Sequence, residues 1–250
     1  MELIVATQKW LSSTFEMKDM GEAEYILGVK IHRDRFKKLF LSLSQETYIK
    51  RIIERFRIKV ILDPTIWVAV KRILRYLKGT SDLALCYHGG SLRLVGYSDA
   101  DGSADRDERK STSGYAFLLG GVAITWCSKK QPCISLSTMK AEYVACTSAV
   151  QEAIWLRRFL KSLRISAHIN DAVVIYCDNT ATIAYAKDPK YHGRTKHIDT
   201  RYHFIRDSVA QEEVFLRHIP TNDMIADPFT KPLRRDAFHR HVSSMGLRRI

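Results

Sequence analysis

The sequence predicts an α/β protein in two parts, and three observations support this fold class. Four short runs of residues look like strands, at 83–88, 92–99, 113–121 and 122–128. A long helical pattern follows from about Thr138 to Arg164. Residues 172–177 (AVVIYC) are almost all apolar, which is typical of a strand buried on both faces. Three antiparallel strands, a helix, a buried central strand, and helices with one more strand make an α/β domain.

The residues before this domain contain a predicted hairpin and two helices. Residues 24–33 and 39–43 read as strands joined by a basic turn. Ser44 is a good N-cap for a helix, and a second helix is expected from Pro64 to about Gly79. Lys71, Arg72, Arg75 and Lys78 lie on this second helix, and an ordinary solvated face is the simpler explanation for them.

Local signals place the remaining elements. Gly120 and Gly121 indicate a hairpin turn between the third and fourth strands. Short helices are expected around 179–187 and 196–210, then a strand at 214–219, then helical sequence to the end.

Composition and charge restrict the class of protein. The chain has 250 residues, 46% hydrophobic and 27% charged, and a formal net charge of +13. A basic balance favours a polyanionic partner, most commonly nucleic acid. We see neither a membrane-spanning apolar stretch nor a secretory signal, so an intracellular location (cytoplasm or nucleus) is expected. The five cysteines form no CxxC pair and are expected to be buried free thiols. The oligomeric state is left open.

Four acids stand at the ends of apolar elements. Asp99 closes one strand, Asp178 closes the buried strand, Glu142 lies early in the long helix, and Asp227 lies in the stretch MIADPF. Two neighbouring strands that each end in Asp bring like charges together, which requires protons or metal. Oxygen ligands without His or Cys suit Mg²⁺ or Mn²⁺ rather than zinc. The alternative is that these acids are helix caps or ion-pair partners, and Asp178 in particular can cap the helix that follows it.

Several long motifs resemble one family. The stretches 96–121, 124–145, 152–163, 177–207 (CDNTATIAYAKDPKYHGRTKHIDTRYHFIRD) and 224–233 (MIADPFTKPL) closely resemble the ribonuclease H domain of copia-type (Ty1/copia) retrotransposon polyproteins. The stretches 15–34, 41–56 and 70–80 resemble the end of the reverse transcriptase of the same polyprotein. The resemblance therefore implies a truncated reverse transcriptase remnant over 1–80, formed by the hairpin and helices. It implies a ribonuclease H-like domain over 83–250, a mixed five-stranded sheet with helices on both faces.

The resemblance also implies an activity and a site. The expected reaction is metal-dependent endonucleolytic hydrolysis of the RNA strand of RNA–DNA hybrids. Asp99, Glu142, Asp178 and Asp227 match the four carboxylates that hold two Mg²⁺ ions, for which Mn²⁺ is a possible substitute. Asp101 is a rival for the first position, and Asp99 is preferred because it is nearer the strand body. The alternative function is an inactive remnant that binds nucleic acid without cleaving it.

Other residues are candidates for contacts with the hybrid. Asn179 and either Ser111 or Thr112 are plausible donors to 2′-hydroxyl groups. Arg194, Lys196, His197 and Arg201 form a basic segment expected to contact phosphates, with a plain solvated helix as the alternative. His218 is a possible auxiliary residue near the metals.

The chain departs from the family pattern in three places. A YVDD-type polymerase motif is absent, so no polymerase activity is expected. The join at 57–65 is shorter than in family members, which suggests an internal deletion. Gly102 stands where the family usually has Trp, and Met139 and Lys140 replace a small and an acidic residue. None of these departures removes an expected metal ligand.

Overall fold

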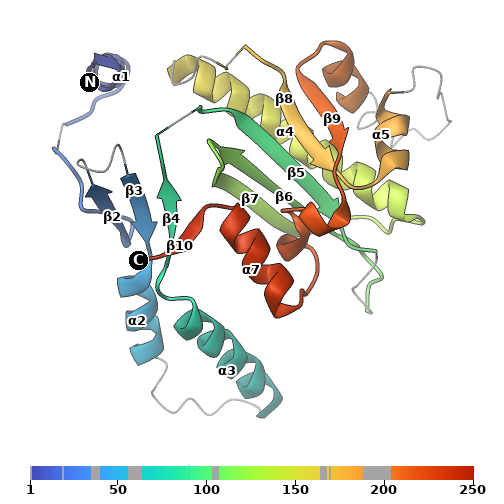
Figure 1. Cartoon of the computed structure of the whole chain (residues 1–250), viewed down its shortest axis with the longest axis horizontal. Coiled ribbons are helices and arrows are strands. Elements are labelled where there is room, and N and C mark those ends of the chain that lie inside the picture. The colour runs from blue at the N-terminus through green and yellow to red at the C-terminus, as the bar shows by residue number, and fades with distance from the viewer. Residues whose placement is uncertain are drawn as a thin grey trace. The chain divides into compact units, whose positions relative to one another are not determined.

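The computed structural model of the chain divides into two compact units, Met1–Gly89 with Gly246–Ile250, and Gly90–Met245 (Figure 1). It describes residues 2–18, 20–34, 40–55, 64–89, 91–102, 107–163, 168, 170–187 and 204–250. Within this described part of the chain, no helix is both long and apolar enough to cross a membrane.

The first unit is built around an antiparallel sheet with the strand order β1-β2-β3-β4-β10. Its strands are β1 (Tyr25–Ile26), β2 (Val29–Asp34), β3 (Phe40–Ser44), β4 (Leu83–Tyr87) and β10 (Leu247–Arg249). Its helices are α1 (Glu2–Thr14), α2 (Glu46–Arg55) and α3 (Pro64–Gly79). The side-chain oxygen of Ser44, Oγ, accepts a hydrogen bond from the Glu46 N–H at 3.2 Å, as expected of an N-cap residue. The expected helix from Pro64 to Gly79 is also confirmed.

The strand β10 corrects the prediction that the sequence is helical to its end. Residues 247–249 pair with Leu83–Leu85 of β4 and so complete that edge of the first sheet. Gly246, at φ +84°, adopts the left-handed conformation in which the chain leaves the preceding helix. Because β4 also belongs to this sheet, the second compact unit begins at Gly90, later than the expected domain start at 83.

The second unit contains a mixed five-stranded sheet with the strand order β7-β6-β5-β8-β9. The strands are β5 (Leu94–Ala100), β6 (Thr112–Leu119), β7 (Val122–Lys130), β8 (Val173–Cys177) and β9 (Val214–His218). The first three are antiparallel, whereas β8 runs parallel to both β5 and β9. Gly120 and Gly121, at φ +61° and +83°, form the expected turn between β6 and β7. This is the predicted sheet, with β8 buried at Val173, Val174, Ile175 and Cys177.

Helical segments cover both faces of this sheet. The long helix α4 (Thr138–Leu163) and the short helix α5 (Thr180–Lys187) pack on one face, where Phe117, Tyr143 and Ile175 are core residues. The 3₁₀ turn η2 (Asp227–Phe229) lies against the other face, because a Cβ at Gly114 of β6 would meet Phe229 and Thr230. The unit also contains a helix at 204–210, the turn η1 (Thr221–Asp223) and the helix α7 (Arg235–Ser244).

Three of the five cysteines follow the expectation of buried free thiols. Cys86, Cys146 and Cys177 are buried and Cys127 is half-buried, all as free thiols. Cys133 is exposed. It lies between the end of β7 and the start of α4, where connecting chain runs over the surface.

Candidate metal centre

Asp99 and Asp178 lie at the carboxyl ends of two adjacent parallel strands. Tyr97 of β5 pairs with Tyr176 of β8, so the same register carried two residues further brings Asp99 opposite Asp178. Asp99 is 1% exposed, and Asp178, the first residue after β8, is half-buried. The parallel pairing thus gathers two acids that are far apart in the sequence.

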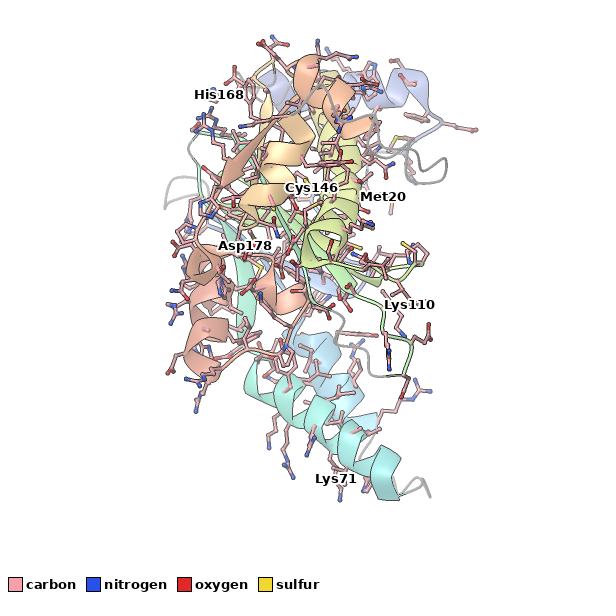
Figure 2. The ribbon with its side chains drawn as sticks, turned by 90° about the vertical axis from the view of Figure 1, so that its right-hand side faces the viewer. Met20, Lys71, Lys110, Cys146, His168 and Asp178 are labelled. Atoms are coloured by element: carbon pink, nitrogen blue, oxygen red, sulfur yellow. The ribbon has the colours of Figure 1, made fainter. Side chains whose placement is uncertain are left out.

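Glu142 and Asp227 reach the same place from two helical segments. Glu142 lies near the start of α4, and its carboxyl group is hydrogen-bonded by the backbone of Ala100, at the end of β5. Asp227 is the first residue of η2. Both side chains are buried, at 6% and 4% exposure. Figure 2 labels Asp178, the residue that follows β8, and Cys146 of α4.

The four acids interact electrostatically. Burial raises the pKa of Asp99 to about 6, and the charges on Asp227 and Asp178 add to the effect, while Thr230 and Lys231 oppose it. Burial raises the pKa of Glu142 to about 9, with further contributions from Asp99 and Asp178. Burial also raises the pKa of Asp227, again with a contribution from Asp178. These raised pKa values mean that it is unfavourable for all of the acids to be ionised at once unless cations lie beside them.

The donor atoms at this site suit a divalent cation. Glu142 Oε2 is buried and has no hydrogen-bond partner among the described residues. Single ligand atoms of Glu142, Cys177 and Asp178 all lie within 4.8 Å of one another. A buried carboxylate oxygen without a donor is costly, and a metal ion is one partner that would compensate. With carboxylate oxygens in the majority, the donor set fits Mg²⁺ or Mn²⁺.

Three further polar residues contact the acids, and the sequence analysis did not predict them. The hydroxyl of Thr230 donates a hydrogen bond to Asp99 Oδ2. The ammonium of Lys231 lies 2.9 Å from Asp227 Oδ1 and 3.7 Å from Asp99 Oδ2. Thr221, in η1, donates from Oγ1 to Asp178 Oδ2 at 2.8 Å. Thr230 and Lys231 stand three and four residues after Asp227 in the motif ADPFTKPL, a spacing that returns to the same side of a helical turn.

The alternative of a helix cap is wrong for Asp178, whereas the alternative of an ion pair does describe Asp99 and Asp227, which both lie beside the Lys231 ammonium. Asn179, not Asp178, caps α5: its Oδ1 accepts a hydrogen bond from the Thr182 N–H at 2.9 Å. Asp101, the rival of Asp99, accepts a hydrogen bond from the Thr112 N–H at 2.7 Å, and its own N–H donates to the Thr112 carbonyl. These contacts give Asp101 a role in closing the end of the β5–β6 pair and leave Asp99 as the better candidate ligand.

The residues predicted to contact nucleic acid differ in exposure and in whether the structure describes them. Ser111 is buried, which argues against a direct contact with substrate, whereas Thr112 and Asn179 are half-buried at the site end of the sheet. His218 is exposed and pairs with Cys177, the residue that precedes Asp178. The predicted basic segment lies outside the described residues; it comprises Arg194, Lys196, His197 and Arg201.

The mixed sheet with the strand order β7-β6-β5-β8-β9 and helices on both faces is a ribonuclease H-like fold. No protein-family model matches the chain. The chain is 38% identical to the Retrovirus-related Pol polyprotein from transposon TNT 1-94 of Nicotiana tabacum, over 98% of the chain and 23% of that polyprotein. It is 40% identical to the corresponding polyprotein from transposon RE1 of Arabidopsis thaliana, over 73% of the chain and 12% of the relative. Its close homologues are thus Pol polyproteins of copia/Ty1-type retrotransposons, and the chain spans less than a quarter of their length.

A solved structure with a similar arrangement is LC11-RNase H1 in complex with an RNA/DNA hybrid. The two are 15% identical, with a TM-score of 0.41 over 55% of this chain and 94% of that one. The match to the Nicotiana polyprotein counts 309 positions against the 250 residues of this chain, so that relative carries at least 59 residues without a counterpart here (309 − 250). The predicted short join at 57–65 lies mostly outside the described residues, which omit 56–63.

Proposed function

We propose that the unit Gly90–Met245 is a metal-dependent endonuclease that hydrolyses the RNA strand of RNA–DNA hybrids. The observation that carries this proposal is the convergence of Asp99, Glu142, Asp178 and Asp227, three of them buried, at the end of two adjacent parallel strands. Such a cluster is costly to keep unless cations offset it. The relation to retrotransposon Pol polyproteins supports RNA–DNA hybrids as the substrate class.

The four carboxylates have a defined chemical task in this proposal. They would hold two divalent ions, Mg²⁺ or Mn²⁺, against the anionic backbone of the hybrid. The chemistry that such ions would supply is activation of a water and stabilisation of the leaving oxygen in an in-line displacement. Thr221 and Thr230 orient Asp178 and Asp99 by hydrogen bonds, so that the ligand oxygens are fixed before substrate arrives. Thr112 and Asn179 are the proposed donors to the RNA strand.

Cleavage of a labelled RNA–DNA hybrid with Mg²⁺ tests the proposal. Asp178→Asn keeps the shape of the side chain and removes its charge, so cleavage is expected to fall at least a hundredfold. Asp171→Asn is the matched control, because Asp171 is an exposed residue of the same unit whose partner is His168, 3.3 Å away. Equal cleavage by wild type and Asp178→Asn contradicts the proposal. Preference for duplex DNA over the hybrid contradicts the proposed substrate.

A second candidate function is binding of nucleic acid without cleavage. The helix α3 carries Lys71, Arg72, Arg75 and Lys78 and contains no acidic residue. Lys71 also lies over the ring of Trp67, 5.3 Å from its centroid. A cationic helix of this kind suits contact with phosphates. This function predicts salt-sensitive binding of the hybrid that is the same in EDTA and in Mg²⁺, and no cleavage in either.

A further inference from the structure

Lys231 brings a positive charge into the acid cluster. Its ammonium nitrogen lies 2.9 Å from Asp227 Oδ1 and 3.7 Å from Asp99 Oδ2. Asp99 and Asp227 are buried and come from β5 and η2, so one lysine joins acids of two separate elements. Among the ion pairs of the described residues, only those of Lys231 join a lysine to two acids of the cluster.

The contacts of Lys231 involve two of the acids that a metal centre requires. Both oxygens are candidate metal ligands under the proposed function. An ammonium group and a divalent ion repel each other, and the repulsion is strong where the surroundings are poorly hydrated. The ammonium and an ion between Asp99 and Asp227 therefore compete for the same two carboxylates. Either it moves, or the ion binds more weakly.

Lys231 is partly exposed and flexible, whereas its neighbour Thr230 is buried. The Lys231 side chain is 33% exposed, and the flexible four-carbon stem of a lysine lets the ammonium turn toward solvent. Thr230, by contrast, is buried and holds Asp99 with its hydroxyl. One residue thus keeps the carboxylate oriented while the next supplies a removable charge.

We propose that Lys231 is a resident counter-ion that competes with divalent metal ions for Asp99 and Asp227. It stabilises the acid cluster in the metal-free protein and withdraws toward solvent when ions bind. This inference rests on the proposed metal centre and goes beyond it, because it assigns a competing internal cation. A lysine side chain is a cation at neutral pH, and the ammonium of Lys231 lies against the carboxylates of Asp99 and Asp227.

The test compares Mn²⁺ binding by calorimetry, without nucleic acid, and thermal unfolding in EDTA. Lys231→Met is expected to bind Mn²⁺ about tenfold more tightly than wild type and to unfold at a lower temperature in EDTA. Lys231→Gln is a second variant, for which Mn²⁺ affinity should also rise and the unfolding temperature in EDTA should also fall. Its polar side chain is less disruptive than methionine at a partly exposed position among acids. Lys130→Met is the matched control, because Lys130 is an exposed lysine paired with Glu108, at 3.2 Å, outside the cluster. It should change neither measurement appreciably.

The opposite signs of the two effects distinguish competition from a structural role. If Lys231 had a merely structural role, its removal would lower stability and weaken metal binding together. Lys231→Arg should restore the wild-type values, since it keeps the charge. If wild type binds Mn²⁺ and both Lys231→Met and Lys231→Gln bind it equally or more weakly, the inference is overturned and the metal centre stands. If wild type binds no Mn²⁺, the metal centre is overturned and this inference with it.

Discussion

Thr221 donates a hydrogen bond from its Oγ1 to Oδ2 of Asp178 across 2.8 Å, although 43 residues separate the two in the sequence. The contact ties the turn η1, which follows β9, to the end of β8. It leaves Asp178 Oδ1 available to a metal ion and limits the rotation of the carboxylate. A partner that orients a ligand in this way commonly affects metal affinity about 10–100-fold.

Removal of this hydroxyl is therefore expected to weaken the metal centre. Thr221→Val keeps the shape of the side chain but cannot donate, and Mn²⁺ affinity and hybrid cleavage should both fall about tenfold. Thr221→Ser keeps the donor and should behave as wild type. Calorimetric Mn²⁺ titration with a parallel cleavage assay measures both effects. Wild-type affinity in Thr221→Val would show that Asp178 needs no orienting partner.

Gly114 allows η2 to approach the sheet closely. A Cβ at this position would lie 2.6 Å from Thr230 Cγ2 and 3.0 Å from Phe229 Cβ, closer than atoms normally pack. Gly114→Ala should destabilise the protein by about 1–3 kcal/mol, a usual cost of overpacking. It should also weaken Mn²⁺ binding, because Asp227 and Thr230 belong to the displaced segment.

Gly102 provides the matched control for this substitution. A Cβ there would have Thr138 Cγ2 as its nearest neighbour, at 3.9 Å, an ordinary contact distance. Gly102→Ala should leave the unfolding free energy and metal affinity near the wild-type values. Denaturant unfolding in EDTA and Mn²⁺ titration check the pair of variants. Equal stability of Gly114→Ala and Gly102→Ala would contradict the close packing of η2.

Much of the fold was predictable because its signals are local. The Gly120–Gly121 turn, the apolar run of β8 and the Ser44 cap each depend on a few neighbouring residues. The strand β10 was not predictable in this way. Its three residues, Leu247–Arg249, are extended because they pair with β4, which lies about 160 residues earlier. Register between distant strands is a tertiary property that a short segment does not encode.

The same distinction applies to the candidate site. Acids at strand ends are visible in the sequence, so Asp99 and Asp178 were found from their positions. The residues that orient and neutralise them were missed, because a threonine or a lysine gains its role only from what lies across the fold. Thr221 is an example: nothing near it in the sequence points to Asp178. Lys231 lies within the motif MIADPFTKPL, but only its distances to two acids give it a role.

The stability of the metal-free protein should fall as pH rises. Burial raises the pKa of Glu142 from 4.5 to about 9 and that of Asp99 from 3.8 to about 6. A folded state that binds its proton more tightly than the unfolded chain gains stability at low pH. This stability is fully present below the unfolded pKa values and is lost as pH rises through the folded ones.

Thermal unfolding in EDTA between pH 5 and pH 9 measures this dependence. The midpoint should decrease across the range, and Glu142→Gln should flatten its upper half, because glutamine has no proton to lose. Added Mn²⁺ should stabilise the wild type more at pH 8.5 than at pH 5.5, since the ion replaces the lost protons. An unchanged slope in Glu142→Gln would show that this carboxyl group is not protonated near neutral pH.

Asn179 combines a structural role with a proposed role in substrate binding, and two substitutions separate them. Its Oδ1 caps α5 through the Thr182 N–H, while its side-chain NH₂ is the proposed donor to the RNA strand.

Asn179→Ala removes both functions and should cost about 1 kcal/mol of stability. Asn179→Ser keeps a capping oxygen but loses the longer amide, so it should unfold like wild type yet cleave the hybrid about threefold to tenfold more slowly, the usual effect of one lost hydrogen bond. Cleavage kinetics at several hybrid concentrations, with unfolding curves for each variant, decide the matter. If Asn179→Ser keeps wild-type stability and cleavage, Asn179 is a helix cap alone.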